Sequence, residues 1–148
     1  MRYFLDTEFD GFGGPLISLA LAAEDGSSLY LATDCPTPTE WVRDNVMPII
    51  TVPGADPLPV EADQFGPLIA VFLRRDPNPI IVADWPDDIR YFCAALITGP
   101  GLMVNIPGCK FEMVRVDAYP TDLPGAVQHN ALWDARALMR RLMPGAAQ

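Results

Sequence analysis

Short apolar runs in the first part of the chain predict β-strands. The first run covers residues 2–8, and two more, 16–23 and 28–33, flank the dipeptide Asp25-Gly26. Aspartate followed by glycine favours the tight turn of a β-hairpin, so the second and third runs should pair as neighbours. We therefore expect three antiparallel strands to open the fold.

Helices are expected in the middle of the chain. Residues 39–46 can form a short helix with Trp41 and Val42 facing inward, and the proline-rich segment 48–59 is expected to be mostly loop. A further helix is expected from Glu61 or Asp63 to Arg74, because four apolar residues repeat there at helical spacing: Phe65, Leu68, Ile69 and Phe72.

The second half of the sequence alternates between strands and helices. A short buried strand is expected at 79–83, a helix from 87 to about 97, a strand at 111–116, a loop at 120–125, and a last helix from its cap Asn130 to Leu142. The helix at 87–97 would bury one apolar stripe, made of Ile89, Phe92, Cys93 and Leu96. This order predicts an α/β fold in which helices flank a mixed sheet.

Length and composition favour one globular domain that spans residues 1–148. Half of the residues are hydrophobic, which is enough for one well-buried core. The longest apolar stretch, 16–23, is far shorter than the roughly 20 residues that cross a bilayer. The first residues also lack the layout of a secretory signal, so we expect a cytoplasmic protein without membrane association. The cysteines favour neither a disulfide framework nor a zinc site: Cys35, Cys93 and Cys109.

The charge of the chain restricts how it can bind nucleic acid. Its formal net charge is -9, and its isoelectric point is near 4.3. Proteins that hold long duplexes by neutralising phosphates depend on clustered lysine and arginine, so this mode of binding is disfavoured. Metal ions bound among acidic residues can invert the local field, so any affinity for a strand end should depend on metal.

Two acidic residues of the first predicted strand are candidates for metal ligands. Asp6 and Glu8 are two positions apart, so both side chains point to the same face of the strand. Like charges that project from a central strand repel each other and lose solvation, and hard divalent cations with oxygen ligands relieve both effects. The same spacing also fits an edge strand with a solvated acidic face.

The last predicted helix adds a third carboxylate and the one histidine of the sequence. Asp134 lies in the inward-facing apolar stripe of this helix, where a metal is a reasonable partner for a buried acid. It can alternatively be an acid that stabilises the helix dipole. His129 precedes the cap residue Asn130, so its ring can lie beside Asp134, although a lone histidine can also be structural.

These residues resemble the DEDDh exonucleases, a family with a ribonuclease-H-like fold. The segment FLDTEF, residues 4–9, is similar to the family's first motif, an apolar strand that carries Asp-x-Glu. The segment HNALWDA, residues 129–135, is similar to the third motif, a histidine followed by four residues and an aspartate. The opening MRYFLDTEF is also similar to a compact bacterial subgroup, the exoribonuclease AS type.

The family's second motif places an aspartate at the start of a helix that follows a central strand. The segment DWPDDIRYF, residues 84–92, can provide it, but Asp84 stands where many members carry asparagine. We choose Asp88 as the ligand, because the family usually has large apolar residues three and four positions later, here Tyr91 and Phe92. Asp84 and Asp87 remain alternatives.

The resemblance implies a ribonuclease-H-like fold and a 3′-to-5′ exonuclease that uses two Mg²⁺ or Mn²⁺ ions. Asp6 would bridge both ions, and Glu8, Asp88 and Asp134 would complete the ligand set. His129 would act as the general base, since an imidazole can take a proton from water at neutral pH.

The expected substrate is the 3′ end of single-stranded RNA, released as nucleoside 5′-monophosphates. Single-stranded DNA in a repair or proofreading role is an alternative, because RNA and DNA are distinguished by pocket details that the sequence does not reveal. A non-catalytic nucleic-acid-binding module with the same fold is another. The resemblance also suggests a homodimer.

Overall fold

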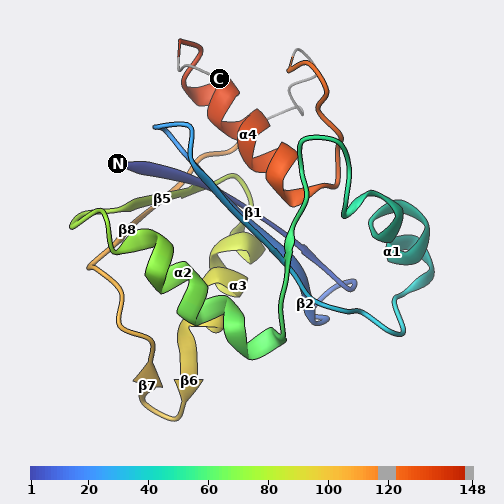
Figure 1. The fold of residues 1–148 in the computed structure, drawn as a ribbon, viewed down its shortest axis with the longest axis horizontal. Coiled ribbons are helices and arrows are strands. Elements are labelled where there is room, and N and C mark those ends of the chain that lie inside the picture. Colours follow the sequence, from blue (N-terminus) through green and yellow to red (C-terminus); the bar gives the residue numbers. More distant parts are fainter. Residues whose placement is uncertain (117–122, 146–148) are drawn as a thin grey trace.

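The protein has an α/β fold with a mixed six-stranded sheet. The computed structural model describes residues 1–116 and 123–145. The strands of the sheet are β1 (Arg2–Phe9), β2 (Leu16–Ala23), β3 (Ser28–Ala32), β4 (Leu58–Pro59), β5 (Ile80–Ala83) and β8 (Lys110–Met113). They lie in the order β4-β3-β2-β1-β5-β8 (Figure 1). The expected α/β fold with a mixed sheet is therefore confirmed.

The described residues also form four α-helices, two 3₁₀ turns and a small hairpin. The helices are α1 (Glu40–Asn45), α2 (Phe65–Leu73), α3 (Pro86–Leu96) and α4 (Ala131–Leu142). The 3₁₀ turns cover Met47–Ile49 and Ala62–Gln64, and the hairpin consists of β6 (Ile97–Gly99) and β7 (Leu102–Met103). No helix in residues 1–116 and 123–145 is long and apolar enough to span a membrane.

Strand direction changes at β1, near the middle of the sheet. On one side β1, β2 and β3 are antiparallel, as their hairpin signals predicted, and Asp6 pairs with Ala20. On the other side β5 runs parallel to β1, with Phe4 beside Val82, and β8 runs parallel to β5. The carboxyl ends of β1, β5 and β8 therefore point to one edge of the fold, the usual place for a ligand site in an α/β sheet.

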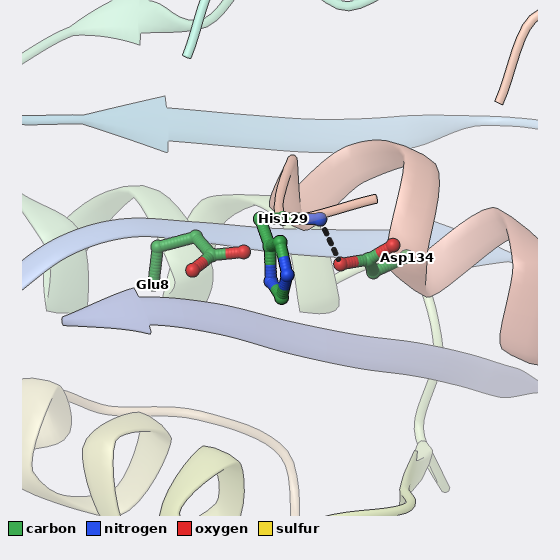
Figure 2. A group of neighbouring side chains, drawn as sticks. All are labelled: Glu8, His129 and Asp134. Carbon is green, nitrogen blue, oxygen red and sulfur yellow. Dashed lines mark hydrogen bonds between the residues drawn. The ribbon is translucent and has the colours of Figure 1, made fainter. Parts of the chain in front are cut away.

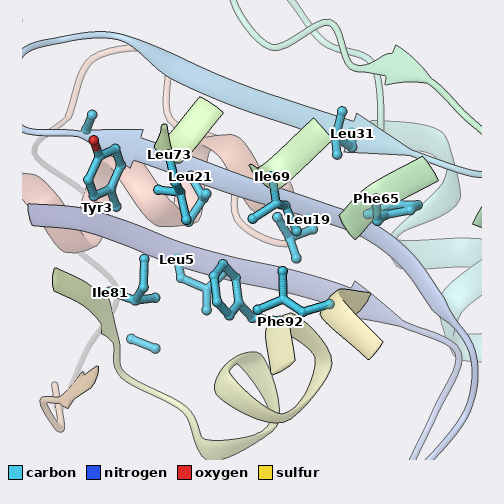
Figure 3. Close-up of a cluster of buried hydrophobic side chains, with 13 residues drawn as sticks. Tyr3, Leu5, Leu19, Leu21, Leu31, Phe65, Ile69, Leu73, Ile81 and Phe92 are labelled. Atoms are coloured by element: carbon cyan, nitrogen blue, oxygen red, sulfur yellow. The ribbon is translucent and has the colours of Figure 1, made fainter. Parts of the chain in front are cut away.

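Each face of the sheet is covered by helices, and successive side chains of β1 point into one or the other of these two layers. Figure 1 shows α4 on one face of the sheet and α2 and α3 on the other. Tyr3 and Leu5 pack into the larger cluster with apolar residues of α2 and α3 such as Ile69 and Phe92 (Figure 3). Phe4 points to the opposite face, where it packs with alanines and leucines of α4. Both faces of β1 are thus buried.

Several predicted boundaries move by a few residues. The helix expected to begin at 61 or 63 consists of a 3₁₀ turn followed by α2, and residues 48–59 are loop except for the end of the first 3₁₀ turn and β4. The helix expected to end at about 97 ends at Leu96 because Ile97 starts β6, and β8 covers 110–113 rather than 111–116. The loop predicted at 120–125 lies partly outside the described residues.

The inward orientation predicted for Trp41 is wrong. Val42 is buried as expected, but Trp41 is 54% exposed. The helix α1 has six residues, and Val42 packs in a small cluster with Val46 and Ile17. Adjacent helical residues point about 100° apart, so a helix this short buries one side and leaves its neighbouring tryptophan outside.

We predict that Gly66→Ala destabilises the protein, although alanine normally favours a helix over glycine. Gly66 is buried in α2 against α3, and a Cβ there would overlap the carbonyl oxygen of Ala95. Overpacking of this kind costs about 1–3 kcal/mol, which should lower the free energy of unfolding in urea. Val71→Ala, at an exposed position of the same helix, is the control and should change it by less than about 0.5 kcal/mol.

Candidate metal centre

The second half of β1 places two carboxylates on the face that α4 covers. Strand alternation puts Asp6 and Glu8 on the same side as the buried Phe4. Because β1 pairs with β2 on one side and β5 on the other, it is an inner strand and not a solvated edge. The alternative of an acidic edge strand is therefore excluded.

The end of β5 brings two more carboxylates to Asp6. Since Phe4 lies beside Val82, the chain leaves β5 at Asp84, close to the level of Asp6. Asp88 follows in the first turn of α3. One carboxylate oxygen from each of Asp6, Asp84 and Asp88 lies within 4.8 Å of the others. We call these three residues the β5-side group.

Asp88 is held in this group by Thr7, whose side chain points to the face of β1 opposite that of Asp6. Its Oδ1 accepts hydrogen bonds from the backbone N–H of Thr7 at 3.0 Å and from the Thr7 hydroxyl at 2.7 Å. Its Oδ2 and the Oδ2 of Asp6 are buried without a hydrogen-bond partner among the described residues. Buried carboxylate oxygens are normally satisfied, so two such atoms in one group are what a cation site requires.

Asp87 points away from the group. Its carboxylate accepts a hydrogen bond from Arg90 at 2.8 Å and from the indole N–H of Trp85 at 3.3 Å. Of the three candidate aspartates in this segment, the structure therefore gathers Asp84 and Asp88 around Asp6 and leaves Asp87 outside.

A second group forms between β1 and the start of α4. Ligand atoms of Glu8, His129 and Asp134 lie within 4.8 Å of one another. Figure 2 shows the imidazole of His129 between the two carboxylates. The backbone N–H of His129 donates to Asp134 Oδ2 at 2.9 Å, which ties the loop to the helix (Figure 2). We call these three residues the α4-side group.

The position of His129 depends on a left-handed backbone and on the residue that follows it. His129 has φ of 65°, the one positive φ outside glycine in the described residues. Asn130 is fully buried, and its side chain accepts from the Trp133 N–H at 3.1 Å, as expected of a helix N-cap. Its amide also donates to the carbonyls of Ile49 and Ile50 at 2.8 and 3.1 Å. The strained residue is therefore held by a fully bonded neighbour.

The indole ring of Trp41 contacts the imidazole ring of His129. The two rings meet edge to face, with centroids 5.1 Å apart and planes at 85°. A side chain that was expected in the core thus forms part of the wall around the imidazole.

Burial and mutual repulsion raise the pKa of several carboxyl groups in the two groups. Burial is the main cause of each shift: it raises the pKa of Asp6 well above the usual range and the pKa of Glu8 to about 8. Asp88 and Asp134 raise both values further. The pKa of Asp88 rises to about 7, mainly through burial and against the effect of the Thr7 hydrogen bond. Deprotonating the site therefore needs a compensating positive charge.

The donor set fits hard divalent cations. It consists of five carboxylates and one imidazole, without cysteine, and oxygen-rich sites of this kind suit Mg²⁺ and Mn²⁺. The β5-side and α4-side groups could each hold an ion. Carboxylates of both groups also raise the pKa of Asp6, so Asp6 lies close to both. A shared pair of ions is therefore compatible with this arrangement.

Each acid and the histidine chosen from the sequence belong to one of the two groups. These residues are Asp6, Glu8, Asp88, Asp134 and His129. Asp84, an alternative in the sequence, joins the site beside Asp88 and does not replace it. The role of Thr7 was missed, although its place between Asp6 and Glu8 on the opposite face of the strand was a usable signal.

The sequence matches no protein-family model, and no curated protein is similar enough to count as a match.

We predict that Glu8→Gln stabilises the metal-free protein at neutral and alkaline pH. With a folded pKa of about 8 against an ordinary 4.5, Glu8 contributes stability below pH 4.5 that is lost as pH rises through 8. The variant lacks this loss, so its melting temperature should exceed that of the wild type by an amount that grows from pH 5 to pH 8.

Thermal melts at several pH values, with and without Mn²⁺, measure this difference. Mn²⁺ should stabilise the wild type more than the variant, because only the wild type has a carboxylate at position 8 that can lose its proton and bind the ion. Asp56→Asn, at an exposed position, is the control and should melt like the wild type. Equal pH dependence in Glu8→Gln and the wild type would contradict the raised pKa of Glu8.

Proposed function

We propose that the protein is a metal-dependent 3′-to-5′ exonuclease that acts on single-stranded RNA. The observation that carries the proposal is the assembly of the β5-side and α4-side groups on β1 from three separate parts of the sequence. Each part contains one of the motifs that resemble the DEDDh family. The ribonuclease-H-like identity of the fold and a homodimeric assembly, both implied by that resemblance, are parts of the same proposal.

The residues of the site would divide the work of phosphodiester hydrolysis. Bound divalent ions would stabilise negative charge on the attacking and leaving oxygens. Asp6, Asp84 and Asp88 on one side, and Glu8 and Asp134 on the other, would hold them. His129, in the loop before α4 and beside Glu8 and Asp134, would accept the proton of the attacking water.

RNA is favoured as the substrate because the opening residues 1–9 resemble the exoribonuclease subgroup. Single-stranded DNA remains the second candidate, because the chemistry of the acidic groups is the same for both sugars. A module that binds strand ends without cutting them would use the same metal ions. The orphaned oxygens of Asp6 and Asp88 favour metal binding in each case.

We predict metal-dependent shortening of RNA from its 3′ end, and a strong difference between two neighbouring variants. Asp88→Asn should lower the rate by about 100-fold or more. Bound metal ions stabilise the transition state by several kcal/mol, and each loss of about 1.4 kcal/mol lowers the rate tenfold. Asp87→Asn removes the same charge one residue away, outside the two groups. It keeps an amide oxygen that can accept from Trp85, so it should retain most activity.

The assay uses matched 5′-labelled RNA and DNA strands with Mg²⁺, Mn²⁺ or EDTA. Stepwise shortening that stops in EDTA and releases 5′-monophosphates supports the proposal. Strands that stay intact with either metal would refute the nuclease, and metal-dependent binding without cleavage would identify a binding module. A loss in Asp87→Asn as large as in Asp88→Asn would overturn the choice of Asp88.

We predict that His129→Asn slows hydrolysis by about 100-fold, as expected for a lost general base, while Mn²⁺ affinity stays the same. Asparagine is chosen because it tolerates the left-handed backbone of this residue better than alanine does. Gln128→Ala, an exposed neighbour in the same loop, is the control. Single-turnover rates and calorimetric Mn²⁺ titrations separate the two roles, because much weaker Mn²⁺ binding in His129→Asn would make His129 a ligand instead.

A further inference from the structure

An exposed tryptophan stands at the edge of the β5-side group. Trp85 follows Asp84 directly, occupies the N-cap position of α3 and leaves 49% of its surface exposed. Its indole N–H donates to Asp87 at 3.3 Å, which holds one edge of the ring. A large aromatic surface is therefore held beside the candidate metal centre and is open to solvent.

A cation lies over this ring from the neighbouring strand. Since Met113 of β8 pairs with Ala83 of β5, the chain beyond β8 brings Arg115 beside Trp85. The guanidinium carbon lies 4.9 Å from the centroid of the indole ring. Arg115 is exposed and makes no ion pair within residues 1–116 and 123–145.

The charge of Arg115 matters because the surrounding field is negative. The chain carries a net charge of -9, and the nearby Arg90 is paired with Asp87. Burial raises the pKa of Asp84, and the charge of Arg115 lies close enough to this carboxylate to oppose part of that rise. An anionic strand that reaches the acidic groups therefore meets a free positive charge at this side of the sheet.

An aromatic face next to an unpaired guanidinium matches the two parts of a nucleotide. Bases of any sequence stack on aromatic side chains, and arginine binds backbone phosphate. The pair lies beyond Asp84 along the line from β1 across β5 to β8, at the carboxyl ends of these strands. A strand whose phosphate lies at the acidic groups can place its neighbouring nucleotide there.

We propose that Trp85 and Arg115 form a nucleotide subsite, with one base stacked on the indole and one backbone phosphate bound by the guanidinium. The subsite rests on the proposed function, because it extends the path of the same single strand away from the cleavage site. Its ligand is single-stranded nucleic acid next to the phosphate that is cut.

Substitutions of Trp85 and Arg115 should change RNA binding in different ways, so binding measurements alone can test the subsite. Removing one phosphate contact to a single strand lowers the slope of log affinity against log salt by about 0.7, so Arg115→Gln should weaken binding and flatten the slope. Trp85→Ala should weaken binding by about 10-fold with the slope unchanged, and Trp85→Phe should recover most of the loss.

Fluorescence anisotropy of a labelled eight-nucleotide RNA, titrated with each protein in Ca²⁺ at several salt concentrations, measures these effects. A gel run afterwards checks that the strand is intact. Arg74→Gln is the matched control: Arg74 is exposed and follows α2 at the end of the sheet where β5 begins, opposite the site. It removes the same charge and should leave affinity and slope almost unchanged.

The outcomes separate the subsite from the nuclease. If Arg115→Gln binds RNA with the affinity and slope of Arg74→Gln, or if the wild type does not bind the strand, the subsite is wrong. If binding depends on Trp85 and Arg115 but RNA stays intact with Mg²⁺ and Mn²⁺, the subsite is supported and the exonuclease is refuted. Cleavage that is insensitive to both substitutions, with unchanged binding, refutes the subsite alone.

Discussion

The loss of solvation and the mutual repulsion of half-buried carboxylates are the constraint that the centre of this structure has to satisfy. Asp6, Glu8, Asp84, Asp88 and Asp134 meet where β1 emerges between two helical layers, and burial raises the pKa of Asp6, Glu8 and Asp88. A fold tolerates such a cluster only if protons or cations neutralise it. Large apolar layers on both sides of β1 hold the acids together against that repulsion.

The sheet provides this support through its change of direction at β1. The antiparallel partner β2 extends along β1 to its end, whereas the parallel partner β5 stops earlier and lets α3 begin beside Thr7. Asp88 can therefore reach the site from the face opposite Asp6, held by two hydrogen bonds. The start of α4 closes the other side, where Asn130 connects the helix to the loop at Ile49 and Ile50.

The same constraint shapes how an anionic substrate could approach. If the protein acts on a nucleic-acid strand as proposed, its net charge of -9 requires metal ions at the acidic groups before a phosphate can enter, and local cations to guide the rest of the strand. The described residues offer Arg115 for this purpose on the β8 side, next to an exposed aromatic ring. Affinity and catalysis would thus depend on a few residues rather than on a general basic surface.

Local patterns in the sequence determined much of this arrangement. Alternation placed Asp6 and Glu8 on one face of a strand, helical spacing gave α4 its buried stripe, and Asn130 was recognisable as its cap, since each depends on neighbours within a few residues. The sequence also favoured Asp88, through its resemblance to a motif, but left Asp84 and Asp87 open. Tertiary structure decided that Asp84 joins Asp88 at Asp6, because β5 runs beside β1, and that Asp87 turns to Trp85 and Arg90 instead. It also decided the outward position of Trp41 against His129 and the meeting of Trp85 with Arg115. These contacts join segments far apart in the chain, so no local pattern specifies them.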